Sequence, residues 1–294
     1  AVALTDAEGG VPTLVWVIVG LAFLVIVGGL ASVEGSIFGA AFAILVMIFI
    51  LLPVAFITLY AFNEGGYLRL PPRGLSLHWF ANFFAIARFR AALESSLIVS
   101  AIVAPVCLLI ALPAALALVR HRFPGRDTIN GLILSPLVVP GVVTGISFLS
   151  LSAHVGAGLG LLPIAVALSC FAFPFAVRAL VANLHGLDPR LEEAARNLGA
   201  SRWQAFLLVT LPQLRPGLLA GGIFVFVEAI DNFSIAVFLT NSRVTTLPVE
   251  SYSYIRDYDD PTVAAIAVLL MALSAALVFA IDRLVGLDRF LEMK

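Results

Sequence analysis

The chain has 294 residues, of which 61% are hydrophobic and only 12% are charged, and its mean hydropathy is +1.08. A soluble domain carries about 25% charged residues, so this composition excludes an ordinary soluble protein and predicts a membrane protein. The formal net charge is −1, which gives no basic footprint for binding nucleic acid. The apolar runs are far longer than the roughly ten residues of a membrane β-strand. The predicted fold class is therefore all-α and polytopic.

The sequence does not contain the residues that bind ATP. Its only lysine is Lys294, the last residue, whereas a phosphate-binding P-loop needs a lysine followed by Ser or Thr and a helix. If ATP drives the activity, another polypeptide binds the ATP and Mg, so we expect no cofactor in this chain and no enzymatic activity of its own. We also predict no metal site, because the histidines do not form a metal-spaced cluster with Cys or carboxylates: His78, His121, His154 and His185.

The chain begins with a small, acidic segment without Lys or Arg, residues 1–11, so we do not expect a cleaved secretory signal. Residues 12–33 are apolar enough to span a membrane, and an interfacial helix is the alternative. We take residues 1–36 as an additional N-terminal transmembrane segment and 37–294 as the main domain. This division predicts seven spans in all.

Six predicted spans lie in the main domain. The loop 63–90, after the first of them, is rich in Pro, Arg and aromatic residues and predicts an amphipathic segment at the membrane interface. The predicted spans are residues 37–62, 91–119, 129–152, 161–184, 217–240 and 262–282.

The loop 185–216 is the most polar interior part of the C-terminal half, and its first part predicts a short helix. Asp188 and Pro189 are suited to the start of a helix, and Gly199 is placed to end it in a left-handed conformation. Four residues fall on one face and leave a shallow apolar surface against which another protein can pack: Leu191, Ala194, Ala195 and Leu198.

The second part of this loop predicts another helix after a sharp turn. Ser201 and Gln204 have the spacing of a capping box. Pro212 is predicted to end the helix. A loop capped in this way would be rigid enough to transmit a mechanical force.

Two carboxylates and an amide lie near the middle of the predicted span 217–240. Glu228, Asp231 and Asn232 have the spacing i, i+3 and i+4, which predicts one helical face. An ionisable side chain at mid-bilayer costs at least about 2.5 kcal/mol, so we do not expect this face to meet lipid. It predicts either the lining of a path for a cation or a structural hydrogen-bond cluster.

The segment 251–260, which has the sequence SYSYIRDYDD, is predicted to be a polar outer loop that contacts a substrate-delivering protein, caps the path or is simply solvated. The distribution of basic residues predicts the orientation, because cytoplasmic loops carry more Lys and Arg. Ten basic residues lie in 120–127, 185–216 and the tail, against six on the other side. We therefore expect a cytoplasmic C-terminus and a periplasmic N-terminus.

The loop also carries a family motif. From Glu193 to Pro212 the sequence follows the pattern E-A-A, three residues, Gly, nine residues, then I-x-L-P, with Val in place of Ile. This pattern resembles the EAA loop of the permease subunits of binding-protein-dependent ABC importers. The matching positions are Glu193, Ala194, Ala195, Gly199, Val209, Leu211 and Pro212.

The resemblance covers roughly residues 35–290. The runs ESSLIVS, VRHRFPGRD, GGIFVFVEAIDNFSIAVFLT and TTLPVESYSYIR are similar to the spermidine/putrescine branch of the family. Asp231 and Asn232 fall where that branch carries an acidic pair, so the second acid is an amide here. Glu228 has no counterpart.

The resemblance implies a six-span permease core that imports a small, cationic or amine-containing solute. Its implied partners are an ATP-binding cassette ATPase dimer, a second permease subunit, a periplasmic substrate-binding protein and the lipid of a bacterial inner membrane. ATP hydrolysis by the partner would move the EAA loop and produce alternating access.

Two other classes of protein remain as alternatives. An ion-coupled secondary transporter would use the carboxylates of Glu228 and Asp231 for proton or sodium coupling. An intramembrane enzyme would need a nucleophile with an activating base, but the sequence places no histidine at mid-span.

Overall fold

The computed structural model describes residues 37–66 and 74–285. The predicted span 12–33 lies outside the described residues. The chain divides into two compact units, Ala1–Leu59 and Tyr60–Lys294, and each is described by itself. The described part of the first unit belongs to α2 (Ile37–Ala61), which agrees with the predicted span 37–62. Within it, Ala41–Ala61 is long and apolar enough to cross a membrane.

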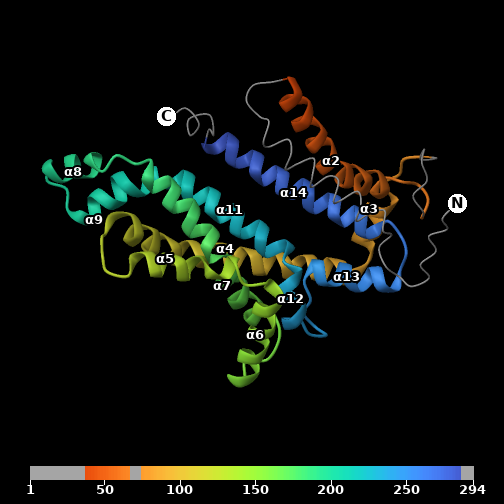
Figure 1. Ribbon diagram of the computed structural model, residues 1–294. Coiled ribbons are helices and arrows are strands. Elements are labelled where there is room, and N and C mark those ends of the chain that lie inside the picture. Colours follow the sequence, from red (N-terminus) through yellow and green to blue (C-terminus); the bar gives the residue numbers. More distant parts are fainter. Residues whose placement is uncertain (1–36, 67–73, 286–294) are drawn as a thin grey trace, which may run out of the picture. The chain divides into compact units, whose positions relative to one another are not determined.

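The described part of the second unit is built from helices (Figure 1), which confirms the all-α prediction. A single isolated bridge joins Asn63 to Leu75 before the first of them. The elements in chain order are α3 (His78–Ala85), α4 (Ala87–Arg120), α5 (Arg126–Leu134), the 3-10 helix η1 (Ser135–Leu137), α6 (Gly141–His154), α7 (Leu161–His185), α8 (Arg190–Asn197), α9 (Arg202–Ala205), the π-helix η2 (Phe206–Thr210), α10 (Leu211–Gln213), α11 (Arg215–Asp231), α12 (Phe233–Leu239), α13 (Leu247–Asp257) and α14 (Thr262–Val285).

Three long helices, α4, α7 and α11, pack against one another and form the centre of this unit. On α4 the buried positions recur every fourth residue, as at Val99, Val103 and Cys107, and α7 repeats the spacing, as at Ile164 and Leu168. Residues four apart share a helical face, so each helix presents one continuous stripe. Many of these side chains are alanines, which allow the backbones of membrane helices to approach closely.

Two glycine pairs are positions of close helix approach. A Cβ on Gly145 of α6 would lie 2.6 Å from Phe238 and 3.2 Å from the backbone of Ile235, both in α12. A Cβ on Gly217 of α11 would lie 2.7 Å from Asn183 of α7. The spacings Gly141-x-x-x-Gly145 and Gly217-x-x-x-Gly221 are therefore helix-packing motifs.

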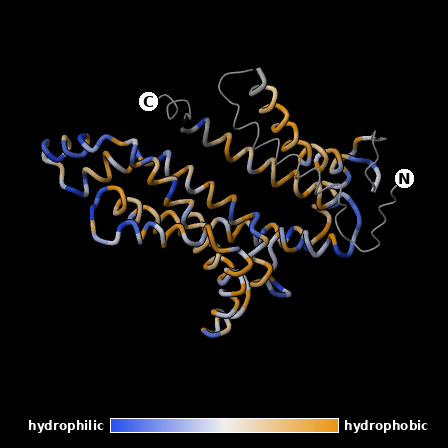
Figure 2. The backbone as a smooth tube through the Cα atoms, in the orientation of Figure 1, coloured by the Kyte–Doolittle hydropathy of each residue, from blue (hydrophilic) through white to orange (hydrophobic). Residues whose placement is uncertain are grey.

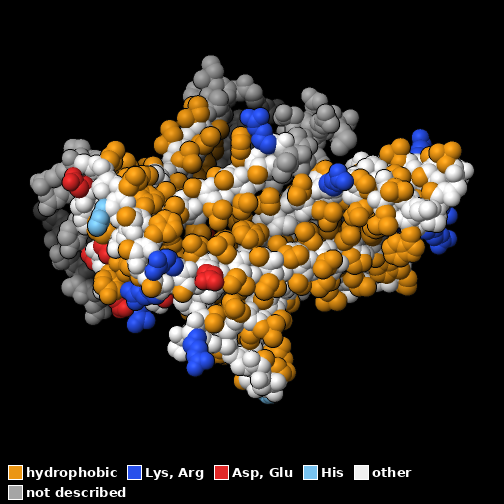
Figure 3. Space-filling model, turned by 180° about the vertical axis from the view of Figure 1, so that it is seen from behind, with side chains coloured by type: hydrophobic (Ala, Val, Ile, Leu, Met, Phe, Trp, Pro, Cys, Tyr) orange, Lys and Arg blue, Asp and Glu red, His pale blue; other side chains and the backbone are white. Residues whose placement is uncertain are grey.

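Hydrophobic residues make up most of the long helices (Figure 2), and many of their side chains are exposed. On the face seen in Figure 3 they form most of the surface, and charged side chains are sparse. Leu109 of α4 is 75% exposed and Leu162 of α7 is 69% exposed. Exposed apolar surface of this extent indicates contact with lipid or with other membrane helices.

The predicted span 129–152 is wrong as one continuous helix. The segments Arg126–Leu137 and Gly141–His154 meet at an angle of 95°. Pro140 explains the break, because the residue before a proline is disfavoured in the helical conformation. Together the two segments are apolar enough to form one broken span or a re-entrant loop.

The predicted span 217–240 is also wrong as one helix. α11 ends at Asp231, and α12 begins at Phe233 after Asn232, whose backbone is extended. The side chain of Asn232 accepts a hydrogen bond from the backbone N–H of Ile235 at 3.0 Å. It therefore starts a new helix as an N-cap instead of continuing the old one.

The prediction of a polar loop at 251–260 is wrong for most of its length, because α13 is helical from Leu247 to Asp257. Leu247, Ser251 and Tyr254 are buried at the helical spacing i, i+4 and i+7. The ring of Tyr254 packs 5.0 Å from that of Phe89 in α4. The polar composition of this segment favoured a loop in the prediction, although the segment forms a helix with one buried face.

The described residues contain four helices that are long and apolar enough to cross a membrane, or up to six spans if each bent pair counts as one. The four are α2, α4, α7 and α14. The second bent pair is Arg202–Gln213 with Arg215–Asp231, at 62°. Counted in this way, the spans correspond to the six predicted for residues 37–294.

The contact between α6 and α12 can be tested at Gly145. We expect Gly145→Ala to lower the thermal unfolding temperature of the detergent-solubilised protein, because the added methyl group would force a shift that costs about 1–3 kcal/mol. Gly131 of α5 is the matched control, since nothing lies within 4 Å of a Cβ there. Gly131→Ala should leave the unfolding temperature unchanged or raise it slightly. An equal effect of the two substitutions would contradict the packing.

Candidate functional site

Hydrogen bonds at both ends of the helix α8 fix where it begins and where it ends, as its sequence predicts. The side chain of Asp188 accepts a hydrogen bond from the backbone N–H of Arg190 at 2.9 Å. At the other end Gly199 has a φ of 96°, and the N–H of Ala200 donates to the carbonyl of Ala195 at 3.1 Å. This is a Schellman ending, in which a left-handed glycine satisfies the last carbonyl groups.

The second half of the EAA loop begins as predicted and ends differently. Ser201 and Gln204 form a capping box, with bonds of 2.8 and 3.3 Å. The prediction that Pro212 ends this helix is wrong. Its missing N–H costs nothing because Pro212 lies in the first turn of α10. The chain instead passes through η2 and bends after Gln213.

The two short helices present apolar side chains to the outside. None of the residues of α8 is buried. Leu198 is 91% exposed and Trp203 is 74% exposed. The side chain of Glu193 is exposed and makes no hydrogen bond or ion pair within the described part of the chain. Glu193, Ala194 and Gly199 of the EAA pattern are therefore exposed and available to another protein, whereas the remaining EAA positions are half-buried: Ala195, Val209, Leu211 and Pro212.

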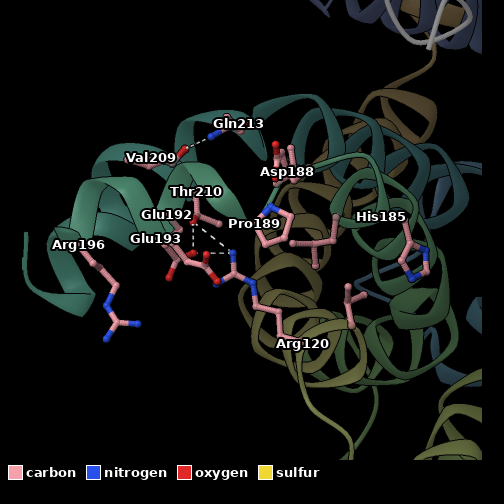
Figure 4. Close-up of a pocket in the computed structure, with 13 residues that line it drawn as sticks. Arg120, His185, Asp188, Pro189, Glu192, Glu193, Arg196, Val209, Thr210 and Gln213 are labelled. Carbon is pink, nitrogen blue, oxygen red and sulfur yellow. Dashed lines mark hydrogen bonds and ion pairs between the residues drawn. The ribbon is translucent and has the colours of Figure 1, made fainter. Parts of the chain in front are cut away.

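Behind α8 lies a pocket of about 580 Å³ that is lined by residues of α4, α7, α8 and the segments η2 and α10 (Figure 4). Three polar side chains meet at its wall. Nη2 of Arg120 lies 2.7 Å from Oε2 of Glu192. The hydroxyl of Thr210 donates to the same Oε2 at 2.6 Å. Arg120 also donates to the Thr210 hydroxyl at 3.3 Å.

The environment of Glu192 favours its ionised form. Burial by itself would raise the pKa of this carboxyl group. The hydrogen bond from Thr210 and the positive charge of Arg120 outweigh burial, so the pKa of Glu192 lies below its ordinary value. Arg120, Glu192 and Thr210 were not predicted as a site, because nothing in their spacing along the chain indicates that the three side chains meet.

The intramembrane polar residues are divided between two places. Nδ2 of Asn232 donates to Oε1 of Glu228 at 3.1 Å, so the structure brings these two side chains together. Asp231 lines a separate pocket of about 400 Å³ between α11, α13 and α14. Ser251 lines the same pocket, and its buried hydroxyl has no hydrogen-bond partner among the described residues. Ser251 is the first residue of the segment 251–260, and nothing in the sequence set it apart from the rest of that segment.

A protein-family model matches most of this chain. Residues 84–287 match the model of the binding-protein-dependent transport system inner membrane component. The chain belongs to this family. It is the permease component of an ABC importer, which confirms the resemblance of the EAA loop and the assignment to a multi-pass inner membrane protein.

Characterised permeases with different solutes are similar to this permease. The spermidine/putrescine transport system permease protein PotC of Haemophilus influenzae is 27% identical over 81% of this chain and 92% of its own length. The putrescine transport system permease protein PotI of Escherichia coli is 30% identical over 76% of this chain and 82% of its own length. The sulfate transport system permease protein CysT of Escherichia coli is 35% identical, but over only 57% of this chain and 66% of its own length.

The fold of the permease is also that of a solved ABC importer. A chain of the bacterial alginate ABC transporter, crystallised with a periplasmic protein that holds an alginate pentasaccharide, superposes with a TM-score of 0.59. The match covers 95% of this chain and 98% of that one at 15% identity. At this identity the likeness supports the fold and carries no information on the solute.

The ionisation of Glu192 predicts a pH-dependent stability. Because its folded pKa is lower than its unfolded pKa, the ionised carboxylate stabilises the permease fully above the ordinary glutamate value of about 4.3. This stabilisation is lost as the pH falls through the folded pKa. We expect Glu192→Gln to lower the thermal unfolding temperature at neutral pH and the difference from the wild type to vanish in acid.

The measurement is thermal unfolding of the purified permease across this pH range. Glu193→Gln is the matched control, because the exposed Glu193 has no partner among the residues that the structure describes, and it should differ little from the wild type at any pH. A difference between Glu192→Gln and the wild type that is the same at every pH would contradict the ionised link.

Proposed function

We propose that the chain couples ATP hydrolysis in separate subunits to the import of a small cationic or amine-containing solute. The observation that carries this proposal is the doubly capped α8–α9 segment, on which Glu193, Leu198 and Trp203 are exposed. In this function an ATPase dimer binds the α8–α9 segment and moves the segment when the dimer closes. The spans then rock and expose a central path to one side of the membrane at a time.

The proposal includes three partners and an orientation. The sequence has no P-loop, so the ATP and Mg belong to the ATPase dimer. A second, related permease subunit completes the path, and a periplasmic binding protein delivers the solute, as the periplasmic protein in the alginate transporter complex suggests. The EAA loop and the C-terminus face the cytoplasm, and the N-terminus faces the periplasm.

The charges in the bundle support a cationic solute. Glu228 and Asp231 lie at the end of α11, and Asp231 opens onto the pocket that Ser251 also lines. Carboxylate oxygens and a free hydroxyl can accept hydrogen bonds from an ammonium group. The same carboxylates would repel sulfate, the solute in the name of CysT. The putrescine and spermidine in the names of PotI and PotC carry amines, so a polyamine-like solute fits best.

A second candidate function is ion-coupled secondary transport, which the intramembrane carboxylates favour. The two functions differ in their requirement for ATP. Uptake by the purified chain driven by a proton or sodium gradient, without any ATPase subunit, would support the secondary transporter and contradict the proposal.

Coupling is tested by substitutions in the EAA loop. We expect Gly199→Pro and Glu193→Lys to leave the protein in the membrane but abolish solute-stimulated ATPase activity of the assembled complex. Proline fixes φ near about −65°, whereas Gly199 has a φ of 96°. A positive charge at Glu193 should oppose docking of the partner. Asp127→Lys on the neighbouring α5 is the control for charge reversal, and normal stimulation in both EAA variants would remove the coupling role.

The cationic path is tested at Asp231. We expect Asp231→Asn to slow uptake about tenfold or more, which corresponds to about 1.4 kcal/mol of lost stabilisation, because the amide keeps the shape and removes the charge. Glu228→Gln should have a smaller effect, since Asn232 already donates to Glu228. The assay is uptake by reconstituted complexes at saturating binding protein. The exposed Asp259→Asn serves as the control, and wild-type uptake by the Asp231/Glu228 double variant would show that the carboxylates do not line the path.

A further inference from the structure

The helix α8 has little apolar attachment to the bundle. It is eight residues long, and none of them is buried. A helix this short is marginal by itself in water. Its position therefore depends on the caps at its ends and on side chains that join it to larger elements.

One carboxylate makes this connection. Oε2 of Glu192 forms an ion pair with Nη2 of Arg120 at 2.7 Å and accepts a hydrogen bond from the hydroxyl of Thr210 at 2.6 Å. Arg120 also donates a hydrogen bond to this hydroxyl at 3.3 Å. The three contacts form a closed triangle, visible as dashed lines in Figure 4. Hydrogen bonds to an ionised group are shorter and roughly twice as strong as neutral ones. Thr210 is only 2% exposed, so one corner of the triangle is fixed in the packed interior.

The triangle joins α8 to two elements of the bundle. Arg120 is the last residue of α4, which packs along α7 and α11. Thr210 is the last residue of η2, the π-helix that leads through α10 to α11. Single π-turns inside helices often mark functional sites. A displacement of α8 therefore reaches the end of α4 through Glu192, and not only α11 through the covalent chain.

The two neighbouring acids of α8 have different surroundings. Both acids line the pocket, but Glu193, which belongs to the EAA pattern, is exposed without a partner in the described chain, whereas Glu192 is bound by Arg120 and Thr210. One acid is available to a partner protein, and the other ties the helix to its own bundle.

We propose that Arg120, Glu192 and Thr210 are positioning residues that make α8 and the end of α4 move as one body when the ATPase closes. This inference rests on the proposed coupling function and adds the route by which the motion enters the span α4. A purely static brace would change stability or assembly without changing how the two helices move relative to each other.

The test is a distance measurement in the assembled complex with its ATPase partner. Spin labels are placed at the exposed positions His121 and Asn197, just after α4 and at the end of α8, with Cys107 and Cys170 replaced by Ser. The distance is measured without nucleotide and after trapping with ATP and vanadate. In the otherwise wild-type complex we expect the same narrow distance distribution in both states.

The variants remove one corner of the triangle at a time. Glu192→Gln, Arg120→Gln and Thr210→Val should each give a distribution that shifts and broadens on trapping. Thr210→Ser keeps the hydroxyl, and Arg122→Gln removes a nearby exposed charge that makes no ion pair in the described chain. Both should behave as the wild type. Thr210→Val preserves the shape of the buried side chain, so it carries the test if a charge variant does not assemble.

Each outcome decides between the possibilities. An unchanged distance in all three corner variants, or a wild-type distance that already changes on trapping, would overturn the positioning role. A double variant Arg120→Glu with Glu192→Arg that restores the narrow distribution would support it strongly. If the complex contains no ATPase and traps no nucleotide, the proposed function itself fails, which is measured separately as vanadate-trapped ADP.

Discussion

The structure depends on one constraint, which is that no backbone N–H or C=O group can be left unsatisfied in the hydrocarbon of a membrane. Long helices meet this constraint by themselves, and most of the described chain is helical. Where a helix breaks within an apolar region, a side chain or a proline explains how. Asn232 caps the new helix α12 with its own amide, and Pro140 ends the preceding segment where α6 begins. The breaks are therefore built into the fold, and the second one places Asn232 where it also donates to Glu228.

The EAA loop, which contains no membrane-spanning helix of its own, keeps its geometry in a different way. Its two short helices contribute no large buried face, so their geometry comes from local hydrogen bonds at Asp188, Gly199 and Ser201. A segment fixed by caps keeps its shape when it is pushed. The carboxylate of Glu192 then joins this rigid segment to the bundle, while the apolar side chains of Leu198 and Trp203 face outward.

Much of this was predictable from the sequence, because the signals were local. The all-α class, the spans at α2, α4, α7 and α14, the capping box and the left-handed Gly199 follow from hydropathy and from residue types at fixed spacing. The breaks in two predicted spans were missed, because apolar length alone does not show whether Asn232 continues a helix or caps a new one. The helix α13 was missed because its buried face is interrupted by tyrosines and acids.

Some of the functional residues were predictable from the sequence and others were not. The EAA positions were predictable because they form a motif along the chain. The link between Arg120, Glu192 and Thr210 was not, since its members are up to 90 residues apart and only the folded chain brings them together. The presence of Asp231 and Ser251 in the lining of one pocket likewise depends on three helices that meet, which no spacing in the sequence indicates.

The central claim is that the α8–α9 segment is the surface on which a separate ATPase acts, and cross-linking in the native membrane tests it most directly. A photoreactive amino acid replaces Leu198, which is 91% exposed, and in a second variant it replaces Val138, which is 85% exposed at the break before α6. Our account predicts that Leu198 captures an ATP-binding subunit and that Val138 does not. Capture of the ATPase from Val138 with none from Leu198 would contradict it.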